Sequence, residues 1–306
     1  MITAYHHPGF AAPIGDHVMP MRKFQLVADA VACRAGVRVE APAPIETEAL
    51  LRVHTAVYVD AVRTGEPRAL AESQKFPWSA ALWPAVRLTN GGALAAASRA
   101  LDDGVAAALA SGFHHAHADH GEGFCTFNGL VVAAEALRAA GRVDRVAVLD
   151  LDLHYGNGTA ALCATRPWLV NCSIYGNDYR ENRPYADVET VRHADGPNHV
   201  SFALPNRSGR DALLAAIERG TAALLERGRP DLVLYQAGAD PYREDPYSPL
   251  DLDHDDLRER DRRVFAWARR AHLPIAWVLA GGYTRDVTKV VGVHVGTFEA
   301  AESVFG

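Results

Sequence analysis

The sequence has few cysteines, no long apolar run and no excess of basic charge, and each shortage excludes a class of protein. Its 306 residues include only 4 cysteines, with no CxxC pair, so neither a disulfide scaffold nor a zinc ribbon is indicated. No apolar stretch is long enough to span a bilayer, and the first residues lack the basic and apolar regions of a signal peptide. We therefore expect a cytoplasmic protein without a membrane partner.

Basic residues are outnumbered by acidic residues, 31 to 37, and the formal net charge is −6. This balance provides no general attraction to DNA or RNA, and we find no run of lysine and arginine that would provide a local one. The sequence therefore predicts no direct nucleic-acid partner. Hydrophobic residues make up 49% of the chain, which is typical of a globular protein with a large buried core.

Short apolar runs alternate with helix-like segments along the chain, which indicates an α/β fold in one domain over residues 1–306. Runs such as RVAVLDLDLH and PIAWVLAGGY suit parallel strands covered by helices on both faces. Strands are expected at Ile2–Tyr5, Val37–Glu40, Val146–Leu153, Leu169–Tyr175, Leu232–Ala237 and Ile275–Leu279. Helices are expected at Gly91–Ala110, Leu130–Ala140, Asp211–Arg227 and Asp255–Ala271. The polar segment 176–205 is expected to be a long functional loop.

The expected strand at 146–153 carries Asp150, Asp152 and His154, which would point to one face of an extended chain. Two carboxylates and an imidazole on a buried face are costly without a cation, so a metal site is favoured over a hydrogen-bonded strand end. Asp240 follows another apolar strand and would complete an Asp-His-Asp set with one open position, the layout of a catalytic site. Taken alone, Asp240 fits a helix cap or a turn equally well.

Other residues near these strand ends suit acid–base chemistry or substrate binding. His114 and His115 are adjacent in a predicted loop, which suggests general acid–base catalysis beside a metal. Taken alone, the pair is better explained as surface or structural histidines. The glycine-flanked loop around Phe124 fits either an apolar channel or a buried turn. Tyr283 follows two glycines and fits either a donor to a developing oxyanion or a tyrosine packed at a strand end.

Taken in order, the motifs HH, GFC, DLDLHYGNG, GAD and GGY resemble those of the histone deacetylase superfamily, which includes acetylpolyamine amidohydrolases and acetoin-utilisation proteins. The resemblance runs from about Tyr5 to Val295 and looks closest to the class IV-like branch. It implies a three-layer arginase/deacetylase fold with a central, mostly parallel, eight-stranded sheet. It implies hydrolysis of an N-acyl-lysine or another acylated amine. Acetylated polyamines are the alternative substrate, a non-catalytic metal-binding homologue is less favoured, and an oligomer is compatible with the family.

The resemblance also implies two cation sites. Zinc, with ferrous iron as the alternative, would be held by Asp152, His154 and Asp240. A structural K⁺ or Na⁺ would be held around Asp150, Asp152, His154, Ser173 and Ile174.

The catalytic residues implied by the resemblance are His114, His115, Tyr283 and Asp150. His115 would be the general base and acid, and His114 would be an electrostatic or auxiliary partner held by Asp150. Tyr283 would polarise the acyl carbonyl. The acyl group would be bound by Phe124, Gly123 and Gly282.

The chain departs from the family pattern at Asn157, where many members carry an aspartate paired with a histidine, so the basicity of His115 is expected to be lower. Tyr155 replaces a common histidine and is assigned no role. Acidic rim residues would favour a polyamine, and the candidates are Glu122, Asp178 and Glu181.

Two other interpretations are disfavoured. A two-metal ureohydrolase of the same fold needs a carboxylate two residues past the metal-binding histidine, where this chain has Gly156. The acidic run Asp251–Asp256 looks like a metal site, but it precedes a helix, where aspartates cap free N–H groups.

Overall fold

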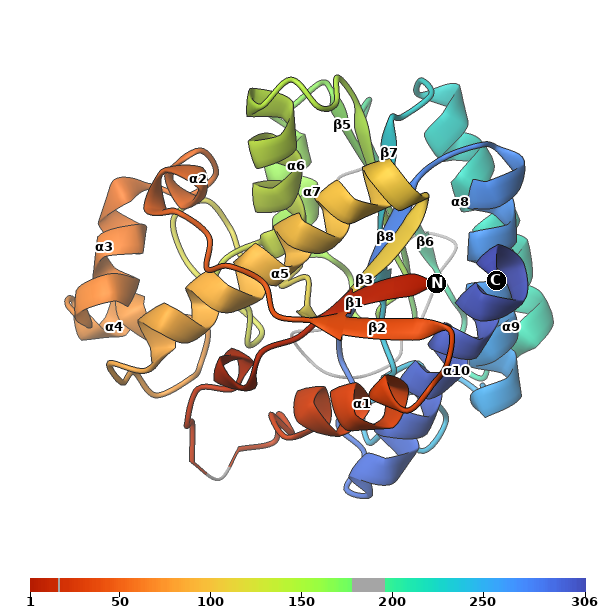
Figure 1. The fold of residues 1–306 in the computed structure, drawn as a ribbon, viewed down its shortest axis with the longest axis horizontal. Helices are drawn as coiled ribbons and strands as arrows, with labels where there is room; N and C mark the ends of the chain where they lie inside the picture. The colour runs from red at the N-terminus through yellow and green to blue at the C-terminus, as the bar shows by residue number, and fades with distance from the viewer. Residues whose placement is uncertain (16, 178–195) are drawn as a thin grey trace.

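The protein is built around one eight-stranded sheet, seen in a computed structural model that describes residues 1–15, 17–177 and 196–306 (Figure 1). The strand order is β2-β1-β3-β8-β7-β4-β5-β6, and all neighbours pair in parallel. The strands are β1 (Ile2–Tyr5), β2 (Val37–Glu40), β3 (Val105–Ser111), β4 (Val146–Asp150), β5 (Leu169–Tyr175), β6 (His199–Ala203), β7 (Leu232–Ala237) and β8 (Ile275–Leu279). The predicted α/β fold with a parallel eight-stranded sheet is confirmed.

Helices cover both faces of this sheet. One layer contains α5, α6 and α7, and the other contains α1, α8, α9 and α10 (Figure 1). The helices are α1 (Lys23–Ala32), α2 (Thr47–Leu51), α3 (Ala56–Thr64), α4 (Arg68–Ala71), α5 (Leu82–Asp103), α6 (Gly129–Ala139), α7 (Asn157–Cys163), α8 (Arg210–Glu226), α9 (His254–Arg270) and α10 (Val287–Phe305). The central strands are apolar at nearly every position because both of their faces are covered.

The strand order brings three loops to one edge of the sheet. Strands β4, β7 and β8 are neighbours, and Asp150 at the end of β4 lies opposite Gln236 of β7 and Ser173 of β5. The segments that follow β4, β7 and β8 therefore meet, although they are far apart in the sequence. Ligands of α/β folds bind at this edge.

Three predicted elements differ from the structure. The helix expected at Gly91–Ala110 ends instead at Asp103, because Gly104 adopts a left-handed conformation with φ of 86°. The alanines that follow form β3, whose residues are all buried. Alanine favours helices locally, but a central strand against a long helix also accommodates small side chains.

The strand expected at Val146–Leu153 ends at Asp150. The next amides on that side of the chain donate to side-chain carboxylates: that of Asp152 to Oδ1 of Asp150 at 3.1 Å, and that of His154 to Oδ1 of Asp152 at 2.9 Å. The segment expected to be a loop at 176–205 contains β6, which pairs with β5. Residues 178–195, with Asp178 and Glu181, lie outside the described residues.

The acidic run before α9 is a helix cap, as predicted. Oδ1 of Asp253 accepts from the amide of Asp256 at 3.0 Å, and Oδ2 of Asp256 accepts from the amide of Asp253 at 3.0 Å. The two aspartates thus form a reciprocal capping box. None of the helices in the described residues is both long and apolar enough to cross a membrane.

Candidate active site

Three predicted metal ligands meet in the interior beyond the ends of β4 and β7. Nδ1 of His154 lies 3.2 Å from Oδ1 of Asp152 and 3.1 Å from Oδ2 of Asp240. One ligand atom from each residue can be chosen so that all lie within 4.8 Å of one another, and the three side chains are buried. In a tetrahedral zinc site with bonds of about 2.0–2.1 Å, ligand atoms are roughly 3.3–3.4 Å apart, so the set fits one such ion.

The charge of this set also suits a divalent cation. Burial disfavours a charged His154, but its hydrogen bonds to Asp152 and Asp240 outweigh burial and raise its pKa to about 10. Burial and the nearby charge of Asp152 raise the pKa of Asp240. Two buried carboxylates next to one imidazole carry more negative charge than the interior can neutralise, and a bound cation removes that cost.

Backbone groups hold the two carboxylates in place. The amide of Gly281 donates to Oδ2 of Asp152 at 2.8 Å, and the amide of Leu153 donates to Oδ1 of Asp240 at 3.0 Å. A Cβ atom at position 281 would lie 1.8 Å from Oδ2 of Asp240, and one at Gly238 would lie 2.6 Å from Oδ1. These glycines are therefore required because the carboxylate passes directly over the backbone.

The adjacent histidines have different hydrogen-bond partners. Nδ1 of His114 lies 2.7 Å from Oδ2 of Asp150, whereas Nδ1 of His115 lies 2.6 Å from Oδ1 of Asn157. The two ring centroids are 4.0 Å apart. Since both partners are acceptors, each Nδ1 carries a proton. The Nε2 atom of a neutral His115 is therefore the nitrogen that can accept a proton.

The two partners give the histidines opposite pKa shifts. Burial lowers the pKa of His114, but the charges of Asp150 and Asp152 outweigh it, and the pKa is raised. The pKa of His115 is well below its usual value because of burial and the neighbouring charges of His114 and His154. The surroundings therefore favour the charged form of His114 and the neutral form of His115, and opposite shifts of this kind are expected of an acid and a base.

Asn157 is oriented by residues on its far side. Its Nδ2 donates to Oε2 of Glu122 at 2.7 Å and lies 2.9 Å from Nε2 of His117. A carboxylate can only accept, so this contact determines which end of the amide faces His115. Contacts with His117 and Asn157 also lower the pKa of Glu122 to about 2, despite partial burial. From the sequence, Glu122 was predicted only as a rim residue, and no role was predicted for His117.

Tyr283 lies beside the metal-ligand set, with its ring centroid 6.2 Å from that of His154 and 6.3 Å from that of Phe124. Its amide donates to Oδ2 of Asp245 at 2.7 Å. Gly282 before it has φ of 135°, which other residues rarely adopt. Tyr283 also lines a cavity of about 660 Å³ together with residues of the N-terminal segment such as His17.

The loop with Gly123 and Phe124 borders the same site. Gly123 has φ of 51°, and a Cβ atom there would lie 2.3 Å from Cδ2 of His115. The Phe124 ring stacks on Phe76 at 5.6 Å and meets the ring of His17 edge-on at 4.8 Å. These aromatic side chains give the site an apolar wall.

The residues predicted for a monovalent cation also lie together. Ser173 of β5 pairs with Asp150 in the sheet register and is buried, as is Ile174. Oγ of Ser173 accepts from the amide of Gly156 at 3.3 Å. Occupation of this place by K⁺ or Na⁺ stays a prediction.

Lys23 is a site residue that sequence reasoning did not predict. It is fully buried at the start of α1, and its Nζ donates to the carbonyl of Ala280 at 2.6 Å and lies 5.8 Å from the ring centroid of Tyr283. Burial lowers its pKa to about 8, although Asp240 and Asp152 oppose the shift. The one sequence feature that sets Lys23 apart is that lysine is rare in this chain, occurring only at positions 23, 75 and 289.

The comparison with protein families matches the histone deacetylase domain over residues 17–297. A histone deacetylase-like amidohydrolase of Pseudomonas aeruginosa is 30% identical over 96% of this chain and 79% of its own length. An acetylpolyamine amidohydrolase of Burkholderia pseudomallei is 34% identical over 75% of this chain and 62% of its own length. Both relatives are named as hydrolases of amide bonds.

Solved structures agree on the fold. An acetylpolyamine aminohydrolase from Burkholderia pseudomallei has a TM-score of 0.80 at 24% identity and covers 99% of both chains. The HDA15 HD domain has a TM-score of 0.81 at 20% identity, covering 100% of this chain and 92% of the other. The family match spans the buried Asp-His-Asp set, both histidines and Tyr283. The chain is thus a member of the histone deacetylase family and a hydrolase that acts on amide bonds.

Proposed function

We propose that this hydrolase is a zinc-dependent deacylase that releases a carboxylic acid from an N-acyl-lysine or another acylated amine. The observation that carries this proposal is the buried set of Asp152, His154 and Asp240 next to two histidines, one bonded to a carboxylate and the other to an amide oxygen. We further propose that residues 1–306 form one domain that acts in the cytoplasm.

Asp152, His154 and Asp240 are the residues that would hold the zinc ion. A divalent ion held there supplies Lewis acidity toward the acyl oxygen and toward water. Mixed carboxylate and imidazole ligands also accept ferrous iron, and elemental analysis of the purified protein distinguishes the two metals. The monovalent ion would be held by the other predicted group, which is Asp150, Asp152, His154, Ser173 and Ile174.

Each polar side chain then has a defined task. Nε2 of His115 accepts a proton from the attacking water, since Asn157 keeps the other proton on Nδ1. Asp150 holds a charged His114 next to it, which offsets negative charge in the transition state. The Tyr283 hydroxyl donates a hydrogen bond to the acyl oxygen as charge develops there. The C–N bond breaks, the new C–O bond completes the acid, and the amine leaves with a proton from a histidine.

The acyl chain would pass between Phe124 and Gly123 on one side and Gly282 on the other. The apolar wall of Phe124, Phe76 and His17 suits a hydrocarbon stem, as found in acetyl-lysine and in acetylated polyamines. Three relatives are named acetylpolyamine amidohydrolases, so acetylated polyamines are the second candidate substrate class.

The test is hydrolysis of an acetyl-lysine peptide and of acetylated polyamines by the purified protein, with metal content measured in parallel. We expect zinc-dependent turnover that a chelator abolishes. Asp152→Asn should lose both the ion and activity. Tyr283→Phe should keep the ion and lose about 10²–10³-fold in kcat, the usual effect of removing one oxyanion donor.

The control is Tyr242→Phe, since Tyr242 bonds to Glu244 outside the site. It should behave like the unmodified protein. Full zinc occupancy without turnover of any acylated amine would reject the proposed substrates, and turnover that survives Asp152→Asn would reject the metal-dependent mechanism.

A further inference from the structure

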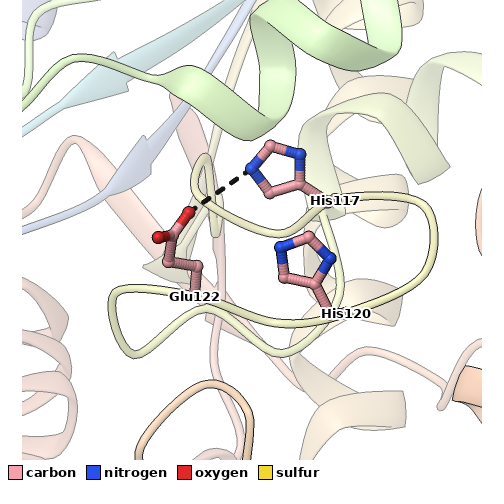
Figure 2. A group of neighbouring side chains, drawn as sticks. All are labelled: His117, His120 and Glu122. Carbon is pink, nitrogen blue, oxygen red and sulfur yellow. Dashed lines mark ion pairs between the residues drawn. The ribbon is translucent and has the colours of Figure 1, made fainter. Parts of the chain in front are cut away.

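A second group of metal-binding side chains lies behind the histidine pair. His117, His120 and Glu122 occupy one short loop, and one ligand atom from each can be chosen so that all lie within 4.8 Å of one another. Figure 2 shows the carboxylate of Glu122 facing the two imidazole rings. The three side chains are half-buried, so an ion could reach them from solvent. The proposed deacylase reaction makes no use of His120.

The separation of two ligand atoms in this group fits a small transition-metal ion. Nε2 of His117 and Oε2 of Glu122 are 3.4 Å apart, close to the ligand separation of roughly 3.3–3.4 Å in tetrahedral zinc sites. Two imidazoles and one carboxylate are a common donor set for zinc, and they leave a fourth position for water.

His120 already has the outer partner that metal-binding histidines use. Its Nδ1 lies 2.7 Å from Oδ1 of Asp119, so Nδ1 carries the proton and Nε2 has the lone pair. A carboxylate on the far nitrogen orients a ligating imidazole and makes it a stronger ligand. The neighbouring Asp119 also adds negative charge, which attracts a cation.

The backbone of this loop is held at several points. The carbonyl of His117 accepts from Nδ1 of His54 at 2.8 Å, and the amide of Thr55 donates to the carbonyl of Ala118 at 2.8 Å. The amide of Gly121 donates to Oγ of Ser73 at 2.9 Å. The ligand-bearing residues are therefore positioned before an ion arrives, which reduces the entropic cost of binding.

We propose that His117, His120 and Glu122 form a second divalent-metal site, selective for zinc-like ions and distinct from the site of Asp152, His154 and Asp240. Because it has only three half-exposed protein ligands, it binds its ion more weakly than the buried site.

The second site is linked to the first through Asn157. Nε2 of His117 and Oε2 of Glu122, the atoms that would bind the ion, are also the atoms that contact Nδ2 of Asn157. An ion bound there competes with that amide and loosens the orientation of Asn157 toward His115. If the proposed function holds, occupation of the second site therefore lowers the rate of deacylation.

The test counts bound Zn²⁺ by equilibrium dialysis and elemental analysis, and it does not depend on any enzymatic activity. The unmodified protein should bind two ions per chain, one tightly and one weakly. His120→Ala should lose only the weak ion, and Asp152→Asn should lose only the tight one. Asp119→Asn should weaken binding of the second ion by about tenfold, as loss of an outer carboxylate does.

His272→Ala is the matched control, because His272 is an exposed histidine far along the chain and should leave both ions bound. Glu122→Gln provides an isosteric second variant that should also lose only the weak ion. One ion per chain in the unmodified protein would overturn the proposal, and so would a weak ion that survives His120→Ala. Neither result tests the deacylase reaction. Failure of that proposal would appear instead as a protein whose tight site contains zinc but which does not hydrolyse acylated amines.

Discussion

At the scale of single residues, the two histidines of the site differ because of their partners. Asp150 is a carboxylate and Asn157 is an amide, although both accept a hydrogen bond from the Nδ1 of an imidazole. The charged partner stabilises an imidazolium and the neutral one does not. A carboxylate partner in one case and an amide partner in the other therefore help to give the neighbouring imidazoles of His114 and His115 different pKa values.

Asn157→Asp should raise the pKa of His115. The new carboxylate would stabilise the imidazolium, while in the unmodified protein burial and two neighbouring charges lower that pKa. Because His115 must be neutral to act as a base, the acidic limb of the kcat/KM profile should move to higher pH, by about one unit or more. The measurement is the pH dependence of kcat/KM.

Glu122→Gln should accompany this substitution, since Glu122 contacts the same side of Asn157 and would repel a second carboxylate. The double variant is therefore compared with Glu122→Gln alone. An unchanged acidic limb would mean that His115 is not the base whose ionisation controls the rate.

At the scale of elements, helix ends and strand ends carry most of the polar chemistry. The aspartates before α9 serve the helix through the capping box of Asp253 and Asp256, whereas those after β4 converge on a buried site. Both groups look alike in sequence. They differ in whether the first turn of a helix or a neighbouring strand end lies next to them.

Asp253→Ala should destabilise the protein by about 1 kcal/mol, the usual cost of losing a helix cap. The hydrogen bond from the amide of Asp256 lowers the pKa of Asp253. A lowered pKa means that the stabilisation is present at neutral pH and is lost as the pH falls through that pKa. Chemical denaturation at pH 7 measures the effect. The control is Asp251→Ala, and equal losses in both variants would argue against a specific cap.

At the scale of the whole molecule, the site joins segments that lie far apart in the sequence. Asp152 follows β4, Asp240 follows β7, and the amide of Gly281 after β8 binds Asp152. An ion at this place would link three neighbouring strands near the centre of the sheet. Its binding energy should therefore contribute to global stability.

Addition of zinc should raise the thermal midpoint of the metal-free protein. A ligand that binds only the folded state adds about 4 kcal/mol of stability at a concentration of 1,000 Kd. Differential scanning calorimetry with and without zinc measures the shift. Asp240→Asn serves as the comparison and should show a much smaller shift, and an equal shift would place the stabilising ion elsewhere.

Much of this protein was determined by the sequence alone. The α/β class, the parallel sheet and the residues gathered after β4, β7 and β8 follow from apolar runs that end in polar residues, because burial on both faces requires such runs. The order of the motifs along the chain is by itself enough to indicate the family. These features are local or depend only on order along the chain.

Only the tertiary structure decided which groups contact each other. It placed Glu122 and His117 behind Asn157, brought Lys23 beneath Tyr283, and converted the alanines of β3 into a strand. Contacts of this kind depend on how loops from distant positions in the sequence pack together. Local sequence patterns do not predict that packing. The physical reason is that a hydrogen-bond partner is selected by position and direction in space, and only the folded sheet supplies both.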